Sequence, residues 1–391
     1  MSTPAREPVI VTGPFVRLWI AHFIQALGFS SMLLLPLYLD FLGASRAEIG
    51  AVMASASVGG LLARPLVGWA LDTIGRKPVL VAGTLLLVGG MGLVAAVDAV
   101  GPMVYAMRIL TGLGTGTLFT GYFTLAADLV PEERRAEGIA LFGISGLTPL
   151  LVNPLTDLLG IDPPQLRWFL PCVGVFILAS LFFLPGVPDS TSTGPPTAFD
   201  WGLARRAMRD RALWPVWMAT CVFAGLVAIF MSFVTVVAED RGIPAPASVW
   251  ATYAGGAILV RLVGARLPER LGLFRVGSTS LLLYACGVAT AAIAHTPLAF
   301  AVAGLLGGIG HGYCFPVLTA QVVTRSPMVV RGIAMALFTG LWELARLLSA
   351  PSFGALADRL GDERMLQTAA ACGLVGIGAW AALERGASSR R

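Results

Sequence analysis

The chain has 391 residues, of which 56% are hydrophobic and only 13% are charged, and its mean hydropathy is +0.80. So few charged residues cannot cover the surface of a water-soluble globule of this length, so the sequence predicts a protein that is solvated by lipid. The net charge of +5 is no sign of nucleic-acid binding in a chain this apolar.

The apolar runs predict membrane-spanning helices, because a span needs roughly 20 residues to cross about 30 Å of hydrocarbon. We expect an all-α membrane protein with twelve transmembrane helices in two six-helix halves. The N-terminal half, residues 1–187, contains spans near 15–39, 47–71, 78–98, 102–125, 135–158 and 168–185. The C-terminal half, residues 212–391, contains spans near 212–238, 247–267, 275–294, 298–324, 331–356 and 366–384. Residues 188–211 form a cytoplasmic linker that ends in a short amphipathic helix rich in arginine.

The segments outside the spans indicate how the chain inserts. Residues 1–13 are polar, so no cleavable signal peptide is expected before the first span. If both termini and the linker are cytoplasmic, the inner segments hold 18 of the 27 Lys and Arg residues, and the outer loops hold five. Because basic residues concentrate on the cytoplasmic side of membrane proteins, we predict that both termini lie inside.

The stretch from Gly68 to Lys77 is a charged loop between two apolar spans, and the sequence repeats it. With an offset of 197, Arg64 falls on Arg261 and Asp72 on Glu269, and a glycine ends both stretches. With an offset of 196, glycines 112, 114 and 116 fall on glycines 308, 310 and 312. Two halves with the same cytoplasmic loops are parallel repeats, for which substrate binds between the halves near the membrane midplane.

These motifs resemble those of the major facilitator superfamily over nearly the whole chain. Gly68-Trp-Ala-Leu-Asp72-Thr-Ile-Gly75-Arg76-Lys77 is similar to the superfamily's cytoplasmic signature, and Arg108 with the glycines that follow it is similar to the fourth span of proton-coupled exporters. Within the superfamily, the stretches 310–316 and 331–344 resemble the bacterial arabinose-efflux-like and drug:proton antiporter group. One departure concerns the fifth span, where Asn153-Pro154 keeps the proline of the exporters without their further glycines.

The charged loops predict a cytoplasmic latch between the halves. Asp72 ends the second span close to the start of the eleventh, where a carboxylate stabilises a helix N-terminus by about 0.3–1 kcal/mol. Arg76 is expected to pair with Asp128, for which the resemblance implies the same locking role, while Glu269 and Arg270 form a weaker mirrored latch. The alternative is a loop that only sets the topology. The predicted latch residues are Gly68, Asp72, Gly75, Arg76, Lys77, Asp128, Glu269 and Arg270.

Charged side chains within the spans are the candidates for coupling, because each costs on the order of 2.5–3.5 kcal/mol to insert. Glu343 is the carboxylate near the middle of a span, and we expect it to carry a proton; a structural ion pair with Arg346 and a substrate contact are the alternatives. Arg108 is assigned to coupling or to anion recognition in preference to a snorkelling role. Arg64 and Arg261 are expected to snorkel to the inner surface.

Polar and aromatic residues of the spans are candidates for the substrate cavity. His22 and Gln25 share a helix face, and His311 with Tyr313 lacks the further ligands that a metal site needs. The predicted cavity residues are His22, Gln25, Phe119, Tyr122, Phe230, His311, Tyr313, Phe338 and Trp342. The five cysteines are dispersed, and no GxxxxGK[ST] loop is present. We therefore expect no metal, no cofactor, no ATP drive and no enzymatic activity.

The sequence thus favours a secondary transporter that works by alternating access, with proton-coupled efflux of a small organic compound such as a drug, a sugar-like molecule or a metallophore. Its expected partners are the substrate, protons and the lipid bilayer, and we expect a monomer in the bacterial cytoplasmic membrane. The alternatives are a facilitator or importer of an organic anion and, from another class, a non-transporting receptor or a polytopic membrane enzyme.

Overall fold

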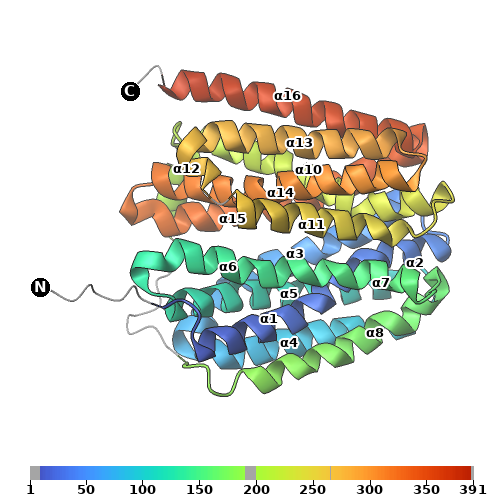
Figure 1. Cartoon of the computed structure of the whole chain (residues 1–391), viewed down its shortest axis with the longest axis horizontal. Helices are drawn as coiled ribbons and strands as arrows, with labels where there is room; N and C mark the ends of the chain where they lie inside the picture. The colour runs from blue at the N-terminus through green and yellow to red at the C-terminus, as the bar shows by residue number, and fades with distance from the viewer. Residues whose placement is uncertain (1–8, 190–199, 265, 389–391) are drawn as a thin grey trace, which may run out of the picture.

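The structure is a computed structural model that describes residues 9–189, 200–264 and 266–388, and every regular element in this part of the chain is a helix. The first group is α1 (Gly13–Ser31), α2 (Leu35–Phe41), α3 (Arg46–Thr73), α4 (Arg76–Leu93), α5 (Pro102–Leu129), α6 (Arg135–Leu147), α7 (Val152–Leu158) and α8 (Leu166–Ile177). A short helix α9 (Trp201–Arg209) follows. The second group is α10 (Trp214–Asp240), α11 (Val249–Val263), α12 (Leu267–Leu271), α13 (Leu273–Ile293), α14 (Pro297–Arg325), α15 (Met328–Leu360) and α16 (Asp362–Ser388). The two groups lie side by side as the N-terminal and C-terminal halves of one bundle (Figure 1).

Short 3₁₀ turns join several of these helices into longer crossings. They are η1 (Met32–Leu34), η2 (Val94–Ala96), η3 (Glu132–Arg134), η4 (Thr148–Leu151), η5 (Pro163–Gln165), η6 (Leu178–Phe183) and η7 (Pro246–Ser248). Ten continuous helical segments in the described chain are long and apolar enough to cross a membrane. Two further helices lie within the same bundle and complete the twelve expected crossings. They are α5, in which glycines, threonines and Arg108 lower the hydropathy, and α11, which has 15 residues. The predicted all-α membrane fold is therefore confirmed.

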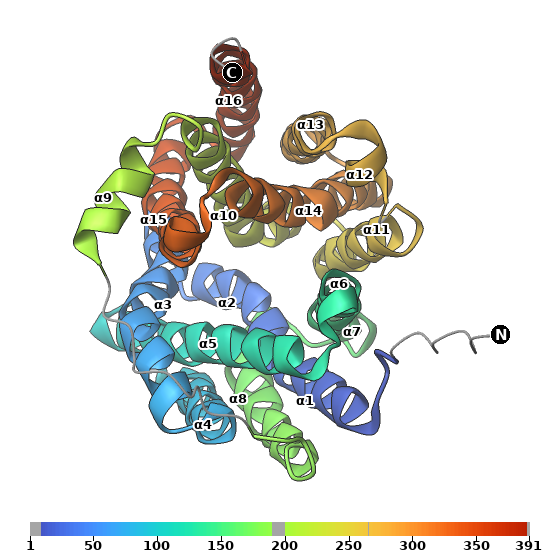
Figure 2. The ribbon, with the colours of Figure 1, turned by 90° about the vertical axis from the view of Figure 1, so that its left-hand side faces the viewer.

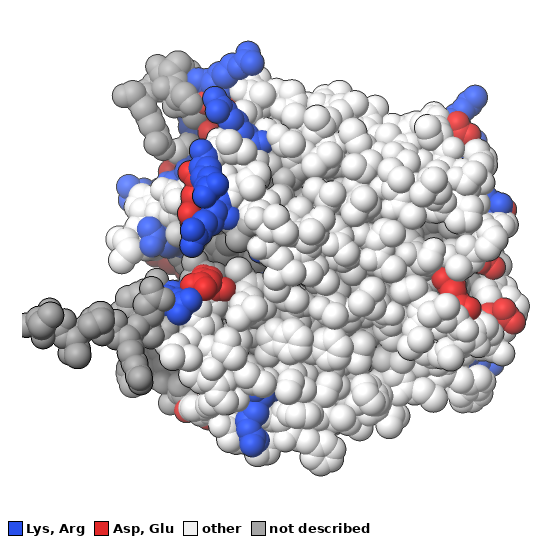
Figure 3. Space-filling model, in the orientation of Figure 1, with Lys and Arg blue, Asp and Glu red and all other residues white. Residues whose placement is uncertain are grey.

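Charge is distributed unevenly between the two ends of the bundle. Helix α1 begins and α16 ends at the same end, as an even number of crossings requires (Figure 1). In the face shown in Figure 3, most Lys and Arg side chains gather at that end, and the broad band between the ends is almost free of charge. We call the end with the termini the inner end and the opposite one the outer end.

Each half can be divided into two groups of three consecutive crossings. A similar turn follows the second crossing of each group, that is, the second, fifth, eighth and eleventh crossings of the chain. Each has an acidic residue three positions before a glycine whose φ is positive, a conformation in which other residues are strained. The pairs are Asp72 and Gly75 (φ +107°), Asp157 and Gly160 (φ +62°), Glu269 and Gly272 (φ +88°), and Asp358 and Gly361 (φ +85°). The first and third of these turns lie at the inner end and the other two at the outer end, as expected if each half contains two three-crossing units in inverted orientation. Turns of the same kind, Asp40 with Gly43 (φ +82°) and Glu239 with Gly242 (φ +63°), also follow the first and seventh crossings.

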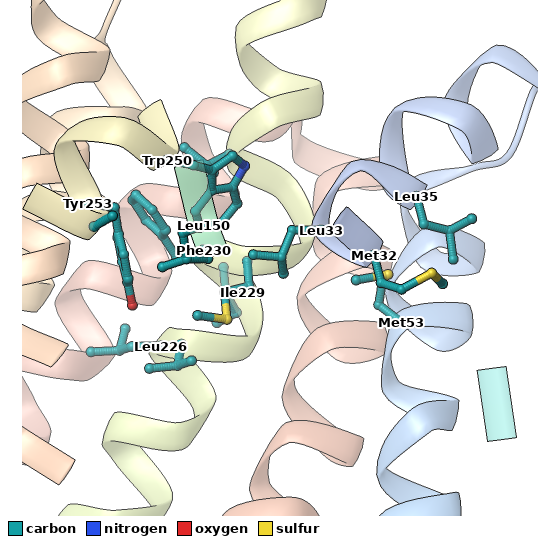
Figure 4. Close-up of a cluster of buried hydrophobic side chains, with 14 of the residues drawn as sticks. Met32, Leu33, Leu35, Met53, Leu150, Leu226, Ile229, Phe230, Trp250 and Tyr253 are labelled. Carbon is teal, nitrogen blue, oxygen red and sulfur yellow. The ribbon is translucent and has the colours of Figure 1, made fainter. Parts of the chain in front are cut away.

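The two halves meet most closely along the outer parts of α3 and α15. A Cβ atom added to Gly50 would lie 2.3 Å from the carbonyl oxygen of Ala350, and one added to Gly354 would lie 2.2 Å from that of Arg46. Glycine is required at both positions, because backbone atoms on both sides leave no space for a methyl group. The close packing also includes buried apolar residues, among them Leu33 of η1 beside Ile229 of α10 (Figure 4).

The Gly354→Ala substitution should therefore force the outer ends apart. We expect a cost of about 1–3 kcal/mol to the outer-closed state, equivalent to a fivefold to hundredfold shift towards outer opening. The buried Ile49 of α3, replaced by cysteine in a background without the native cysteines, reports opening through its reaction with an impermeant maleimide. Gly340→Ala on the same helix is the matched control, because nothing lies within 4 Å of a Cβ at Gly340. Equal labelling rates in the two variants would contradict this assignment.

Candidate functional site

An ion-pair cluster closes the outer end of the bundle. The guanidinium of Arg46, at the start of α3, contacts the carboxylates of Asp40 at 2.5 Å and Asp362 at 3.2 Å and also pairs with Asp240. Asp40 belongs to the N-terminal half, whereas Asp240 ends α10 and Asp362 begins α16 in the C-terminal half. One arginine thus neutralises carboxylates from both halves, and without its charge they would repel one another.

The acidic turns at the outer end contact helix N-termini of the opposite half. The Asp358 carboxylate accepts hydrogen bonds from the backbone N–H of Arg46 at 2.7 Å and of Ala47 at 2.9 Å. The Asp157 carboxylate faces the N–H groups of Ala247 and Ser248, where η7 passes into α11. Carboxylates stabilise helix N-termini through their free N–H groups and the helix dipole. We call Arg46 with Asp40, Asp240, Asp358 and Asp362 the outer latch.

A second group of charges links the halves midway along α3 and α15. The Glu343 carboxylate lies 3.8 Å from the guanidinium of Arg64 on α3 and 3.5 Å from that of Arg346, one turn along its own helix. The side chains keep exposed fractions of 16% for Glu343, 33% for Arg64 and 23% for Arg346. Glu343 is thus an incompletely buried carboxylate whose cationic partners belong to different halves.

The arginines around this pair have unused hydrogen-bonding capacity. Arg108 of α5 is 6% exposed and donates to the carbonyl oxygen of Met53 at 3.2 Å, and its charge repels that of Arg346. Arg261 of α11 lies against α6, where a Cβ on Gly143 would come within 2.6 Å of its Nη1. The Nε atoms of Arg64, Arg108, Arg261 and Arg346 are buried without a hydrogen-bond partner. The expectation that Arg64 and Arg261 snorkel to the inner surface is wrong, because both are held at the interface between the halves.

Each half contains a histidine within an aromatic cluster. His22 of α1 stacks on Phe142 at 4.8 Å between ring centroids, and its Nδ1 lies 2.6 Å from the Ser145 hydroxyl oxygen. Since that hydroxyl donates its proton to the Phe142 carbonyl at 2.5 Å, Nδ1 of His22 carries the hydrogen of the other bond. In the C-terminal half, Nδ1 of His311 pairs with the Tyr253 hydroxyl.

The predicted cavity residues differ in how far they are exposed in this conformation. Phe119 is exposed, and His311 and Trp342 are partly exposed with ring centroids 6.4 Å apart. Gln25, Tyr122, Phe230 and Phe338 are buried in this conformation, and the Tyr313 hydroxyl donates to the Gly264 carbonyl at the end of α11. The described residues contain no group of three or more metal-ligating side chains.

The inner loop between α3 and α4 is held by contacts within the N-terminal half and with the first residues of the linker. The expected pair forms, with Arg76 Nε 3.2 Å from the Asp128 carboxylate, and Arg76 also lies 4.0 Å from Asp72. The Asp189 carboxylate accepts hydrogen bonds from the backbone N–H of Arg76 at 2.9 Å and of Lys77 at 3.4 Å. Gly68 is exposed on α3, and a Cβ there would meet nothing within 4 Å.

Within the residues that the structure describes, the inner end has no ion-pair cluster between the halves like that at the outer end. Among the described residues, no ion pair joins Asp72 to the start of α15, and Glu269 and Arg270 are exposed on α12. The Arg135 side chain, the expected neighbour of the mirrored latch, lies outside the described residues. The neighbouring Arg266 does act electrostatically on Glu137 of α6 across the interface. In the described part of the chain the outer latch therefore joins the halves, the Arg76–Asp128 pair is present, and the predicted contact of Asp72 with the start of α15 does not appear.

Arg46 and Asp189 are functional candidates that the sequence patterns did not single out. Asp40, Asp240 and Asp362 each stand at the outer end of an expected span, and that shared position was the available signal for an outer cluster. The contacts of Asp189 join the loop after α8 to the start of α4, 113 residues apart, and no local pattern announces them.

Comparisons with known proteins agree with this architecture. Residues 18–350 match the family model described as Major Facilitator Superfamily. The multidrug resistance protein MdtL of Shigella flexneri is 25% identical over 364 residues, covering 88% of this chain and 84% of that protein. The staphylopine export protein of Staphylococcus aureus is 23% identical over 373 residues, covering 90% of this chain and 91% of that protein. A crystal structure of the nucleoside transporter NupG superposes with a TM-score of 0.80 at 14% identity, covering 95% of this chain and 99% of that one.

Proposed function

Because this chain belongs to the Major Facilitator Superfamily, and is a multi-pass membrane transporter and not an enzyme, we propose that it exports a small organic compound in exchange for protons. Alternating access moves the substrate site between the two sides of the membrane. Export is supported by the names of two relatives, a multidrug resistance protein and a staphylopine export protein.

The observation that carries the proposal is the contact of Glu343 with Arg64 across the two halves. Arg64 and Glu343 belong to different halves, so their contact forms or breaks when the halves move relative to one another. In the outer-closed conformation Arg64 lies beside Glu343, and the proton leaves towards the inner side. When the halves separate at this level, Glu343 loses Arg64 and takes up a proton from outside. Arg346 moves with Glu343, and Arg108 supplies a further positive charge near the pair.

The inner latch is proposed to form in the opposite, inner-closed conformation. We expect its contacts to resemble those at the outer end, where the Asp358 carboxylate accepts hydrogen bonds from the N–H groups at the start of α3. By the inverted repeat, Asp72 would bind the start of α15 and Glu269 the start of α6. Arg76 paired with Asp128 would hold the loop in place, and Arg270, Lys77 and the turn glycines would support it.

The Asp72→Asn substitution should weaken this inner-closed conformation. Loss of a charged group at a helix N-terminus costs about 1 kcal/mol, so we expect roughly a fivefold shift towards the outer-closed state. Accessibility of a cysteine placed on the inner part of α15 measures the shift, and transport should slow in parallel. Glu132→Gln, which removes an exposed carboxylate of η3 at the same end of the bundle, is the control. Rates and accessibility equal to those of the unmodified protein would exclude the inner latch.

Reconstitution into liposomes with an imposed proton gradient tests the proposed function. A panel of drugs, sugars, metallophores and organic anions is added, and internal pH and compound content are followed together. We expect one class to move against its gradient with proton flux in the opposite direction. Transport of every accepted compound without proton movement would contradict proton exchange.

Facilitated movement or import of an organic anion is the second candidate, and the arginines favour it. Arg64, Arg261 and Arg346 lie where the halves meet, and the charge of Arg346 acts on Arg108. Glu343 is the carboxylate that Arg64 and Arg346 pair with. An anionic substrate would balance the remaining positive charge. In the same liposomes, this candidate predicts movement of an anion that follows the membrane potential and needs no proton gradient.

We propose that the protein acts as a monomer in a bacterial cytoplasmic membrane, with both termini in the cytoplasm. This placement is supported by the basic inner end (Figure 3) and by the positive-inside rule. In the proposed division, residues 1–187 and 212–391 move as the two bodies, and residues 188–211 connect them.

A further inference from the structure

The helix between the halves presents a face of arginines that the transport mechanism does not use. Arg205, Arg206 and Arg209 of α9 line a shallow, open hollow on the surface together with Gly202 and Asp210. The positions 202, 205, 206 and 209 recur at the spacing of one helix face. In this part of the described chain, none of the three guanidinium groups forms an ion pair or a hydrogen bond.

The one carboxylate in the hollow is already in use. Asp210 accepts a hydrogen bond from the backbone N–H of Ala212 at 2.9 Å, at the turn that leads into α10. Asp200, the other nearby carboxylate, caps the first turn of α9 by accepting from the N–H groups of Gly202 and Leu203. The hollow therefore has an excess of positive charge and attracts an anion.

Helix α9 is fixed to the C-terminal half, so its arginines are presented on a firm support. Ala204 and Ala207 are buried where α9 packs against α15. The indole N–H of Trp214 on α10 donates to the Met208 carbonyl at 3.0 Å, and the Arg211 guanidinium lies over the Trp214 ring at 5.9 Å.

The surroundings of the hollow are those of a membrane surface. Figure 2 looks at the inner end and shows α9 on the rim of the bundle, outside α15. Trp201 is 79% exposed, and Met208 and Trp214 are also exposed beside the arginines. Exposed tryptophans next to arginines on an amphipathic helix are typical of the headgroup region, where apolar side chains enter the bilayer and cations meet lipid phosphates.

We propose that Arg205, Arg206 and Arg209 form a binding site for the phosphate headgroup of an anionic lipid in the cytoplasmic leaflet. The headgroup phosphate occupies the hollow, and Trp201 and Met208 contact its acyl chains. The bound lipid ties α9, and through it the C-terminal half, to the membrane surface. Each arginine near an anionic leaflet contributes about a fivefold gain in affinity, so the three together give a preference of about a hundredfold over a zwitterionic lipid.

Native mass spectrometry of the full chain released from nanodiscs with equal phosphatidylglycerol and phosphatidylcholine tests the site. We expect the unmodified protein to retain phosphatidylglycerol preferentially. The variant with Arg205→Gln, Arg206→Gln and Arg209→Gln should lose that preference. The control with Arg266→Gln, Arg270→Gln and Arg385→Gln removes equal charge from exposed inner positions and should keep it. Equal retention by the unmodified protein and the α9 variant, or equal loss in the control, would overturn the proposal.

Two further experiments complete the test. The first distinguishes a lipid from free phosphate, and the second distinguishes loss of binding from misfolding. Inorganic phosphate alone, at millimolar concentration, should neither displace the lipid nor raise the melting temperature, and displacement would identify a free phosphate site instead. The variant with lysine at the same three positions keeps the charge and should keep the lipid preference. Loss of the preference in a lysine variant with an unchanged melting temperature would contradict charge-based binding.

Discussion

Replacing Arg46 by alanine should open the outer end of the protein. In the outer-closed conformation this side chain neutralises Asp40, Asp240 and Asp362, and its removal leaves carboxylates of both halves facing one another. Removing one partner of a fully buried pair costs 3–5 kcal/mol, and Arg46 keeps an exposed fraction of 14%, so we expect a cost on the order of 2 kcal/mol. This corresponds to a shift of about thirtyfold towards the outer-open state. The rate at which an impermeant reagent labels an outer-facing cysteine measures this shift.

Ionic strength provides an internal control for the Arg46→Ala variant. Salt screens the repulsion among the carboxylates of Asp40, Asp240 and Asp362, so raising the salt concentration should partly restore outer closure in the variant. Arg46→Lys keeps the charge but loses the planar guanidinium that contacts several carboxylates at once. Its labelling rate should therefore lie between that of the unmodified protein and that of Arg46→Ala. If Arg46→Ala labels at the rate of the unmodified protein at every salt concentration, the outer latch does not stabilise the closed state.

Replacing Glu343 by glutamine should abolish proton-coupled transport. Glutamine keeps the size of the side chain but is uncharged and cannot take up a proton. Both ion pairs, with Arg64 and with Arg346, are therefore lost. We expect substrate-induced proton flux in liposomes to fall to the level of empty liposomes. Exchange of labelled for unlabelled substrate should persist, because it does not require the return of an empty, protonated carrier.

Two companion measurements make this result specific to the proton. Glu343→Asp retains an ionisable group on a shorter side chain and should keep measurable coupling. Substrate binding to Glu343→Gln, measured directly, separates lost coupling from lost binding. Coupled proton movement that survives in Glu343→Gln would remove Glu343 from the proton pathway. The Arg64 contact would then be a structural ion pair.

The fold could be predicted largely because the lipid solvent restricts the choices. Long apolar runs must be helices in a bilayer, and the offset of 197 residues that relates Arg64 and Asp72 to Arg261 and Glu269 implied two similar halves. The pairing of Arg76 with Asp128 was also predictable, since both positions lie at the inner ends of successive spans, and the structure shows the contact at 3.2 Å.

Contacts between the halves could not be predicted from local patterns. The arginine at position 64 looked like a snorkelling residue near a span end, yet it lies 3.8 Å from Glu343, 279 positions away in the sequence. The relative rotation of α3 and α15 brings them together, and that rotation depends on glycines such as Gly50 and Gly354. Arg46 was counted only as an outer-loop residue for the same reason, since its carboxylate partners come from three different helices.

Distances across both ends of the bundle test alternating access most directly. One pair of spin labels joins Glu48 and Glu363 at the outer end, and another joins Ile74 and Val329 at the inner end, all of them exposed. The protein in liposomes is measured at equal pH on both sides and then with an acidic exterior and a transported compound. Alternating access predicts that the outer distance lengthens while the inner one shortens. Two distances that stay constant, or that change in the same direction, would contradict it.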